Sequence, residues 1–241
     1  MDDFDLLEVL GTLPSLENLT LKAVNPASHP AHAPENSNGQ SGGPKYFEAL
    51  ETLSVTGSFF FIQHLLSFID SPCLKSFNVY PVFNRNEHEL DDHFTPSMAI
   101  VASKWSQSLK NLVIDSSASG NRDADSFAIL KCLMLLTDLH ELQTFHLMGW
   151  RMENIDDDVR RLAMWWPKLK TLRLLLEKTF ISLSTLTIIA ENYPELRCLE
   201  IRLDTSTIPP FDTSSKSLHH KLEVLTVKRV YPSETMLECR I

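Results

Sequence analysis

The residues with the clearest potential for chemistry lie in one short acidic segment. Carboxylates and imidazoles follow one another there, in the run Glu87, His88, Glu89, Asp91, Asp92 and His93. Side chains of both kinds bind divalent metal ions. A metal-dependent hydrolase built on the segment 87–93 is therefore one hypothesis, and it requires a bound metal. The alternative is a solvated, charged loop with no ligand, which is the more common role of such a run.

The rest of the sequence offers little to a catalyst. The segment GQSGGPK (39–45) is a poor match to a phosphate-binding loop, because proline precedes its lysine and no Ser or Thr follows it. The chain has no nucleophile elbow, paired-cysteine zinc motif or dinucleotide fingerprint. Cys73, Cys132, Cys198 and Cys239 lie far apart and are typical of buried, reduced thiols. We therefore expect no enzyme and no cofactor.

Composition narrows the class of protein further. Hydrophobic residues make up 43% of the 241 residues, which is typical of a folded globular protein. The net charge of −9, without a basic stripe, argues against nucleic-acid binding. The acidic N-terminal segment does not resemble a secretory signal, and the most apolar run, 128–136, is too short to span a membrane. These features predict an intracellular protein, cytoplasmic or nuclear, with no membrane partner.

A repeated pattern of apolar residues indicates the elements that would position any site. The pattern is apolar, two polar residues, apolar, polar, apolar, and a fixed pattern of this kind predicts the whole architecture. Its eight copies are LENLTL from Leu16, LETLSV from Leu50, LKSFNV from Leu74, LKNLVI from Leu109, LQTFHL from Leu142, LKTLRL from Leu169, LRCLEI from Leu196 and LEVLTV from Leu222.

Each copy reads as a strand that is followed by a helix. In LKTLRL, Leu172 and Leu174 point to one side of a strand, and Thr171 and Arg173 point to the other. Apolar stripes of helical spacing lie between the copies, as in 156–166 and 182–193, where a crossover to the next parallel strand is needed. Thr95-Pro96 is a typical helix start. Trp166 belongs to such a stripe, so we expect Trp165-Trp166 to pack in the core.

Prolines at one fixed offset complete the repeat unit. Pro14, Pro72, Pro167 and Pro194 each precede the first leucine of a copy by two residues, where proline ends a helix and favours extended backbone. The prediction is a single α/β domain over 1–241, a leucine-rich-repeat solenoid in a right-handed horseshoe arc. About eight parallel strands would form its concave face and helices its convex face.

The units 156–174 and 182–201, with their order of helix, Pro-x-Leu and strand, resemble the repeats of F-box/leucine-rich-repeat proteins. The resemblance covers 13–230. It implies a non-catalytic protein-interaction scaffold, the substrate-recognition region of an SCF-type ubiquitin ligase subunit. In that family an F-box before the repeats binds the Skp adaptor and, through it, a cullin. The twelve residues before Leu13 leave no room for an F-box, so we expect a fragment, a divergent paralogue, or a binder or inhibitor unrelated to ubiquitin.

A partner would bind the strand positions that face away from the helices. Small neutral residues occupy these positions in the first repeats, whereas His146, Arg173 and Glu200 occupy one of them on three successive strands. With the neighbouring Thr144 and Thr171, they are the candidate partner-binding residues. The alternative is that such residues simply suit a tightly spaced sheet.

Three long inserts and the C-terminal segment complete the predictions. The segment 25–45 is rich in Pro, Gly, Ser and Asn and should be disordered. Two further inserts, 81–96 and 203–217, should emerge on the same rim as 25–45, and all three are either a second contact region or tolerated insertions. The chain ends soon after its last predicted strand, so we expect an uncovered strand there that invites further pairing.

Overall fold

The computed structural model describes most of the chain. The described residues are 9–23, 47–82, 90–117, 126–152, 154–177, 179–204, 221–228 and 236–240. The predicted disordered insert 25–45 lies outside them, as do 83–89 of the acidic insert and 205–217 of the third insert. No helix in the described ranges has the length and apolar character that a membrane crossing requires.

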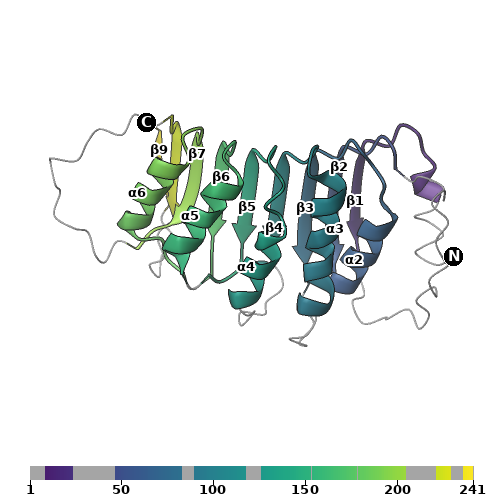
Figure 1. The fold of residues 1–241 in the computed structure, drawn as a ribbon, viewed down its shortest axis with the longest axis horizontal. Coiled ribbons are helices and arrows are strands. Elements are labelled where there is room, and N and C mark those ends of the chain that lie inside the picture. Colours follow the sequence, from purple (N-terminus) through teal and green to yellow (C-terminus); the bar gives the residue numbers. More distant parts are fainter. Residues whose placement is uncertain are drawn as a thin grey trace.

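One nine-stranded sheet runs the length of the molecule, and its strand order follows the chain from β1 to β9 (Figure 1). The first eight strands are parallel to one another, and β9 pairs antiparallel with β8. The strands are β1 (Asn18–Lys22), β2 (Thr52–Gly57), β3 (Ser76–Pro81), β4 (Asn111–Asp115), β5 (Thr144–Met148), β6 (Thr171–Leu175), β7 (Cys198–Arg202), β8 (Val224–Lys228) and β9 (Met236–Arg240).

Helices cover one face of this sheet and connect its consecutive strands from β2 to β7 (Figure 1). They are α2 (Phe59–Phe68), the π-helical turn η1 (Leu90–Phe94) that continues into α3 (Thr95–Trp105), α4 (Ser126–Met134), α5 (Ile155–Trp165) and α6 (Leu183–Asn192). Parallel neighbours require such crossovers, because the chain must return to the same end of the sheet before each strand. The predicted α/β architecture, with eight parallel strands backed by helices, is confirmed.

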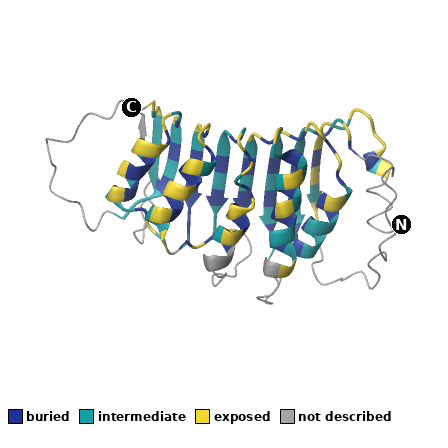
Figure 2. Ribbon diagram, viewed as in Figure 1, coloured by how far each residue is buried: buried dark blue, intermediate teal, exposed yellow. Residues whose placement is uncertain are grey.

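The apolar residues of the repeated pattern form the core. In β6 Leu172 and Leu174 have no exposed surface, while Thr171 and Arg173 are half-buried on the other side. The same alternation occurs from β2 to β7, and Figure 2 shows the buried band running through the strands and the inner sides of the helices. The repeat therefore places one apolar layer between the sheet and the helices.

Buried aromatic side chains link each repeat to its neighbour. The indole nitrogen of Trp166 donates to the backbone oxygen of Leu136 at 3.0 Å, and that of Trp105 donates to the oxygen of Ser71 at 2.7 Å. The predicted core position of Trp166 is confirmed, and Trp165 packs against the same core while partly exposed. Both of these indole N–H groups have a partner, which offsets the cost of removing them from water.

Local sequence signals mark the starts of two helices, α2 and α6. Ser182 caps α6 by accepting from the backbone N–H of Thr185 at 3.2 Å, and Ser58 caps α2 in the same way. The α-helix α3 begins at Thr95-Pro96 as predicted, but the expected capping role of Thr95 is wrong, because the π-helical turn η1 already begins at Leu90 and the N-cap residue is Phe94. Phe94 is fully buried and stacks on Trp150, so its burial favours an earlier start than the capping signal indicates. Residues 90–96 of the predicted rim insert are therefore helical.

The expected uncovered strand after the last repeat is also wrong for β8. The described segment Met236–Arg240 forms β9, which pairs with β8 along its whole length, from Val224 opposite Arg240 to Lys228 opposite Met236. The sequence YPSETMLECRI gave no helical signal, and an antiparallel strand satisfies the same backbone groups that a further repeat would.

Candidate partner-binding surface

The sheet face opposite the helices presents an ordered array of side chains, which we call the open face. It consists of the first, third and fifth residues of each strand from β1 to β8, beginning with Asn18, Thr20 and Lys22. No described helix lies on it (Figure 1). Because neighbouring strands are in register, residues at the same position form continuous rows across the sheet.

The strand register brings the predicted site residues together. His146 lies opposite Arg173, and Arg173 lies opposite Glu200 on the next strand. In the adjacent row Thr144 lies opposite Thr171. All five predicted residues therefore share one area of the open face, on β5, β6 and β7.

An ionic network forms the centre of this area. The Nε of Arg173 lies 2.6 Å from Oε2 of Glu200, and its Nη2 donates to Oε1 at 3.0 Å. The Nζ of Lys228 in β8 lies 3.0 Å from the same Oε1. We call Arg173, Glu200 and Lys228 the charged network. The side chain of Glu200 is only 21% exposed and those of the two cations 31%, so all three groups are held mostly away from solvent.

Lys228 is the member of the network that the sequence analysis missed. It occupies the fifth position of its strand, one row away from Glu200, and only the first and third positions were considered in the search for site residues. Diagonal neighbours on adjacent strands could have identified it, because a long lysine side chain can reach a residue in the next row of the adjacent strand.

His146 in β5 lies next to the charged network and adds an imidazole to it. Its neighbours in the row are Val113 on β4 and Arg173 on β6. Burial lowers the pKa of the His146 imidazole below its usual 6.5, the nearby Arg173 charge lowers it further, and Glu200 partly opposes them. The ring is therefore neutral at pH 7, able to donate one hydrogen bond and accept one.

The row at the carboxyl ends of the strands adds an apolar border and another cation. Met148 and Leu175 lie opposite one another, and Leu175 is only 8% exposed. Arg202 lies opposite Lys228, and its Nη1 donates to the backbone oxygen of Leu176 at 2.9 Å. The area thus combines charged, neutral polar and apolar groups, as protein-binding surfaces do.

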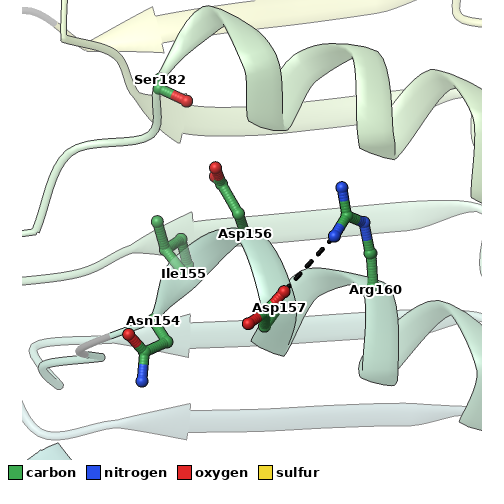
Figure 3. Close-up of a pocket in the computed structure, with 6 residues that line it drawn as sticks. All are labelled: Asn154, Ile155, Asp156, Asp157, Arg160 and Ser182. Carbon is green, nitrogen blue, oxygen red and sulfur yellow. Dashed lines mark hydrogen bonds and ion pairs between the residues drawn. The ribbon is translucent and has the colours of Figure 1, made fainter.

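A separate pocket lies on the helix side, between the first turns of α5 and α6 (Figure 3). Its cavity volume is about 460 Å³, and its lining residues are Asn154, Ile155, Asp156, Asp157, Arg160 and Ser182. Its carboxylates are engaged within the fold. Asp157 pairs with Arg160 at 3.3 Å, and Asp156 accepts from the hydroxyls of Thr185 and Ser184 in α6. The contacts of Asp156 join α5 to α6, whereas the Asp157–Arg160 pair lies within α5, and both are contacts that stabilise the fold.

The acidic segment proposed for a hydrolase is described only in part. Residues 87–89 lie outside the described ranges, Asp92 is exposed, and Nδ1 of His93 lies 2.7 Å from Oε1 of Gln63. Within the part of the chain that the structure describes, no group of three or more His, Cys, Asp or Glu is placed to hold a metal ion.

The chain was compared with known proteins. No protein-family model matches the sequence, and no curated protein matches it significantly.

Proposed function

We propose that the protein is a non-catalytic scaffold of the leucine-rich-repeat type that binds a protein partner on the open face of β5 to β8. The observation that carries the proposal is the charged network: three ionised side chains held together on a solvent-facing sheet. Charged side chains at a half-buried site are costly, because they lose part of their hydration. Small polar residues at these positions would stabilise the sheet equally well. A recognition role accounts for that cost.

The architecture supports a repeat-protein scaffold. Successive strands pair in chain order, and each of five successive pairs from β2 to β7 is connected by a helix on the same face. A unit of one strand and one helix cannot bury its apolar side alone, so stacked units share a continuous core and leave one long sheet face for binding. We propose a solenoid with this sheet on its concave side.

The likeness to F-box/leucine-rich-repeat proteins gives this function a more specific form. In that form the protein selects substrates for an SCF-type ubiquitin ligase inside the cell. Co-precipitation of the full-length gene product with the Skp adaptor and a cullin tests it. If a partner binds the open face and neither ligase component co-precipitates, the protein is a binder or inhibitor unrelated to ubiquitin.

Site-specific photo-crosslinking tests the location of binding. A photoreactive amino acid replaces Thr171, on the open face beside the network, or Thr187, an exposed position of α6 on the opposite side. We expect a crosslinked protein partner from position 171 and none from position 187. Crosslinks from position 187 alone, or from neither position, would overturn the proposal.

A further inference from the structure

We infer that the partner presents an acidic segment, whose Asp or Glu carboxylates pair with Arg173, Lys228 and Arg202 on the open face. The inference rests on the proposed function and specifies the chemistry of its partner. It follows from the local balance of charge and from the hydrogen-bond donors that the network leaves for a ligand.

The local charge of this area is opposite to that of the whole protein. The open-face positions of β6, β7 and β8 carry the cations Arg173, Arg202 and Lys228 and the single carboxylate Glu200, whereas the whole chain carries −9. The corresponding positions of β1 to β4 carry one cation, Lys22, and one anion, Asp115. An excess of positive charge is therefore concentrated on the open face of β6 to β8.

The geometry of the network leaves donors for a second carboxylate. Glu200 accepts a hydrogen bond from Nη2 of Arg173, and it forms ion pairs with Nε of Arg173 and Nζ of Lys228. A guanidinium has five N–H donors and an ammonium has three. Among the described residues, Nη1 of Arg173 makes no hydrogen bond, and Nζ of Lys228 makes an ion pair alone. These donors belong to the two cations that contact Glu200, and a carboxylate of the partner would meet the same two cations.

A basic partner fits this arrangement poorly. The carboxylate of Glu200 already pairs with two cations, so an incoming Lys or Arg would have to displace one of them and lie beside the other. Like charges at that distance repel, and the mostly buried setting strengthens the repulsion relative to bulk water. The same setting strengthens the attraction for an acidic side chain.

The overall negative charge of the protein does not prevent such binding. At physiological ionic strength, charges are screened over about 8 Å. The cations of the open face therefore dominate the potential that a bound segment experiences, while distant carboxylates mainly slow its approach. A nucleic acid is the less favoured anionic partner, since it needs a longer basic stripe than three side chains supply.

Fluorescence anisotropy with defined peptides tests the inference. The probes are labelled peptides of equal length in which glycine alternates with glutamate, glutamine or lysine, together with a labelled oligothymidine of matched charge. The proteins are the full chain and its variants Arg173→Gln, Lys228→Gln and Glu200→Gln. Lys22→Gln is the matched control, because Lys22 lies in the same row as Lys228 at the other end of the sheet. Thermal melting verifies that each variant is folded.

We expect the glutamate peptide to bind about tenfold more tightly than the glutamine peptide at low salt. Arg173→Gln and Lys228→Gln should each weaken its binding about three- to tenfold, which is the loss of one charge pair. Glu200→Gln should tighten its binding, because it removes the competing carboxylate. Lys22→Gln should leave the affinity unchanged. Tighter binding on Glu200→Gln is specific to an acidic ligand, since the same variant would weaken a basic one.

Equal affinity for the glutamate and glutamine peptides would overturn the inference, as would preferential binding of the lysine peptide or the oligothymidine. A glutamate preference that survives Arg173→Gln and Lys228→Gln would place the acidic site elsewhere and overturn it too. If these results were obtained while position 171 still crosslinked to a protein partner, the scaffold function would stand and only the acidic partner would be excluded. Failure of the crosslinking would remove both.

Discussion

The N-terminal and C-terminal halves of the sheet share one core and differ on the open face. Leu53 in β2 and Leu172 in β6 are both fully buried at the same position of the repeat. At the third residue of the strand, however, β2 carries Ser54 and β7 carries Glu200, which two cations contact. The core is therefore fixed by packing in both halves, whereas the open face is free to differ.

This difference shows where a repeat protein can acquire specificity. Replacing a core leucine opens a cavity whichever repeat it belongs to, so the core is uniform along the chain. An open-face residue contacts only its neighbours in the row, and its identity changes the surface without changing the fold. The half in which the open face departs from small neutral residues is the half to which we assign recognition.

Substitutions in the core should give the largest losses of stability, and these losses should be equal in the two halves. Leu53→Ala and Leu172→Ala should each lower the free energy of unfolding by about 2–5 kcal/mol, because each removes buried methyl groups and leaves a cavity. Denaturant unfolding measures both. A loss below about 1 kcal/mol for either variant, or a large difference between the two, would contradict the shared core.

Two glycines at the same position of the repeat, one in each half, should differ in how much stability an alanine substitution removes. Gly149 has a φ of +76°, and a Cβ there would lie 2.5 Å from the backbone nitrogen of Ser117. Gly57, the last residue of β2, occupies the same position of its repeat, and a Cβ there would lie 2.9 Å from the ring of Phe61, a side chain that can move. We expect Gly149→Ala to cost about 1–3 kcal/mol and Gly57→Ala less. Thermal unfolding compares them, and the reverse order would contradict the assigned backbone at Gly149.

The charged network should make a moderate contribution to stability that the N-terminal half lacks. Glu200→Gln leaves two half-buried cations without their carboxylate, and we expect a loss of about 1 kcal/mol, smaller than for a fully buried pair because the cations are partly solvated. Ser54→Ala, in the same row, should change stability by less than about 0.5 kcal/mol. Unfolding at low and high salt tests the pair, and equal losses would remove the distinction between the two halves.

The smallest effect should be the contribution of His146 to the pH dependence of the free energy of unfolding. Its pKa in the folded protein lies below the usual 6.5, so the unfolded chain binds a proton first as the pH falls. The free energy of unfolding should therefore decrease as the pH falls below about 6.5, and His146→Gln should reduce that slope. His64 in α2, whose pKa burial also lowers, serves as the comparison through His64→Gln. A steeper slope in His146→Gln would contradict the sign of the shift.

Sequence reasoning was most successful where one residue type repeats at one spacing. It located the eight parallel strands and the buried sides of Leu172 and Leu174. It located the start of α3 at Thr95 but wrongly expected Thr95 to cap the helix, because the π-helical turn η1 precedes it and buries Phe94 against Trp150, a residue two strands further along the chain. Local signals compete with packing partners that the sequence does not reveal.

The sequence predicted which residues form the candidate site, but it did not predict all the contacts between them. The sequence identified His146, Arg173 and Glu200 as successive open-face residues, because strand alternation alone assigns them to one side. It did not show that Arg173 and Lys228 share the carboxylate of Glu200, since this depends on side-chain reach across three strands.

By itself, the sequence determined the repeat unit, the sides of its strands and the order in which they stack, because these follow from the spacing of apolar residues within each unit. The tertiary structure alone decided which charges meet, where helical backbone begins before α3, and that β9 covers β8. The physical reason is range: apolar periodicity acts over a few residues, whereas an ion pair or a terminal strand depends on groups that only the folded sheet brings within contact distance.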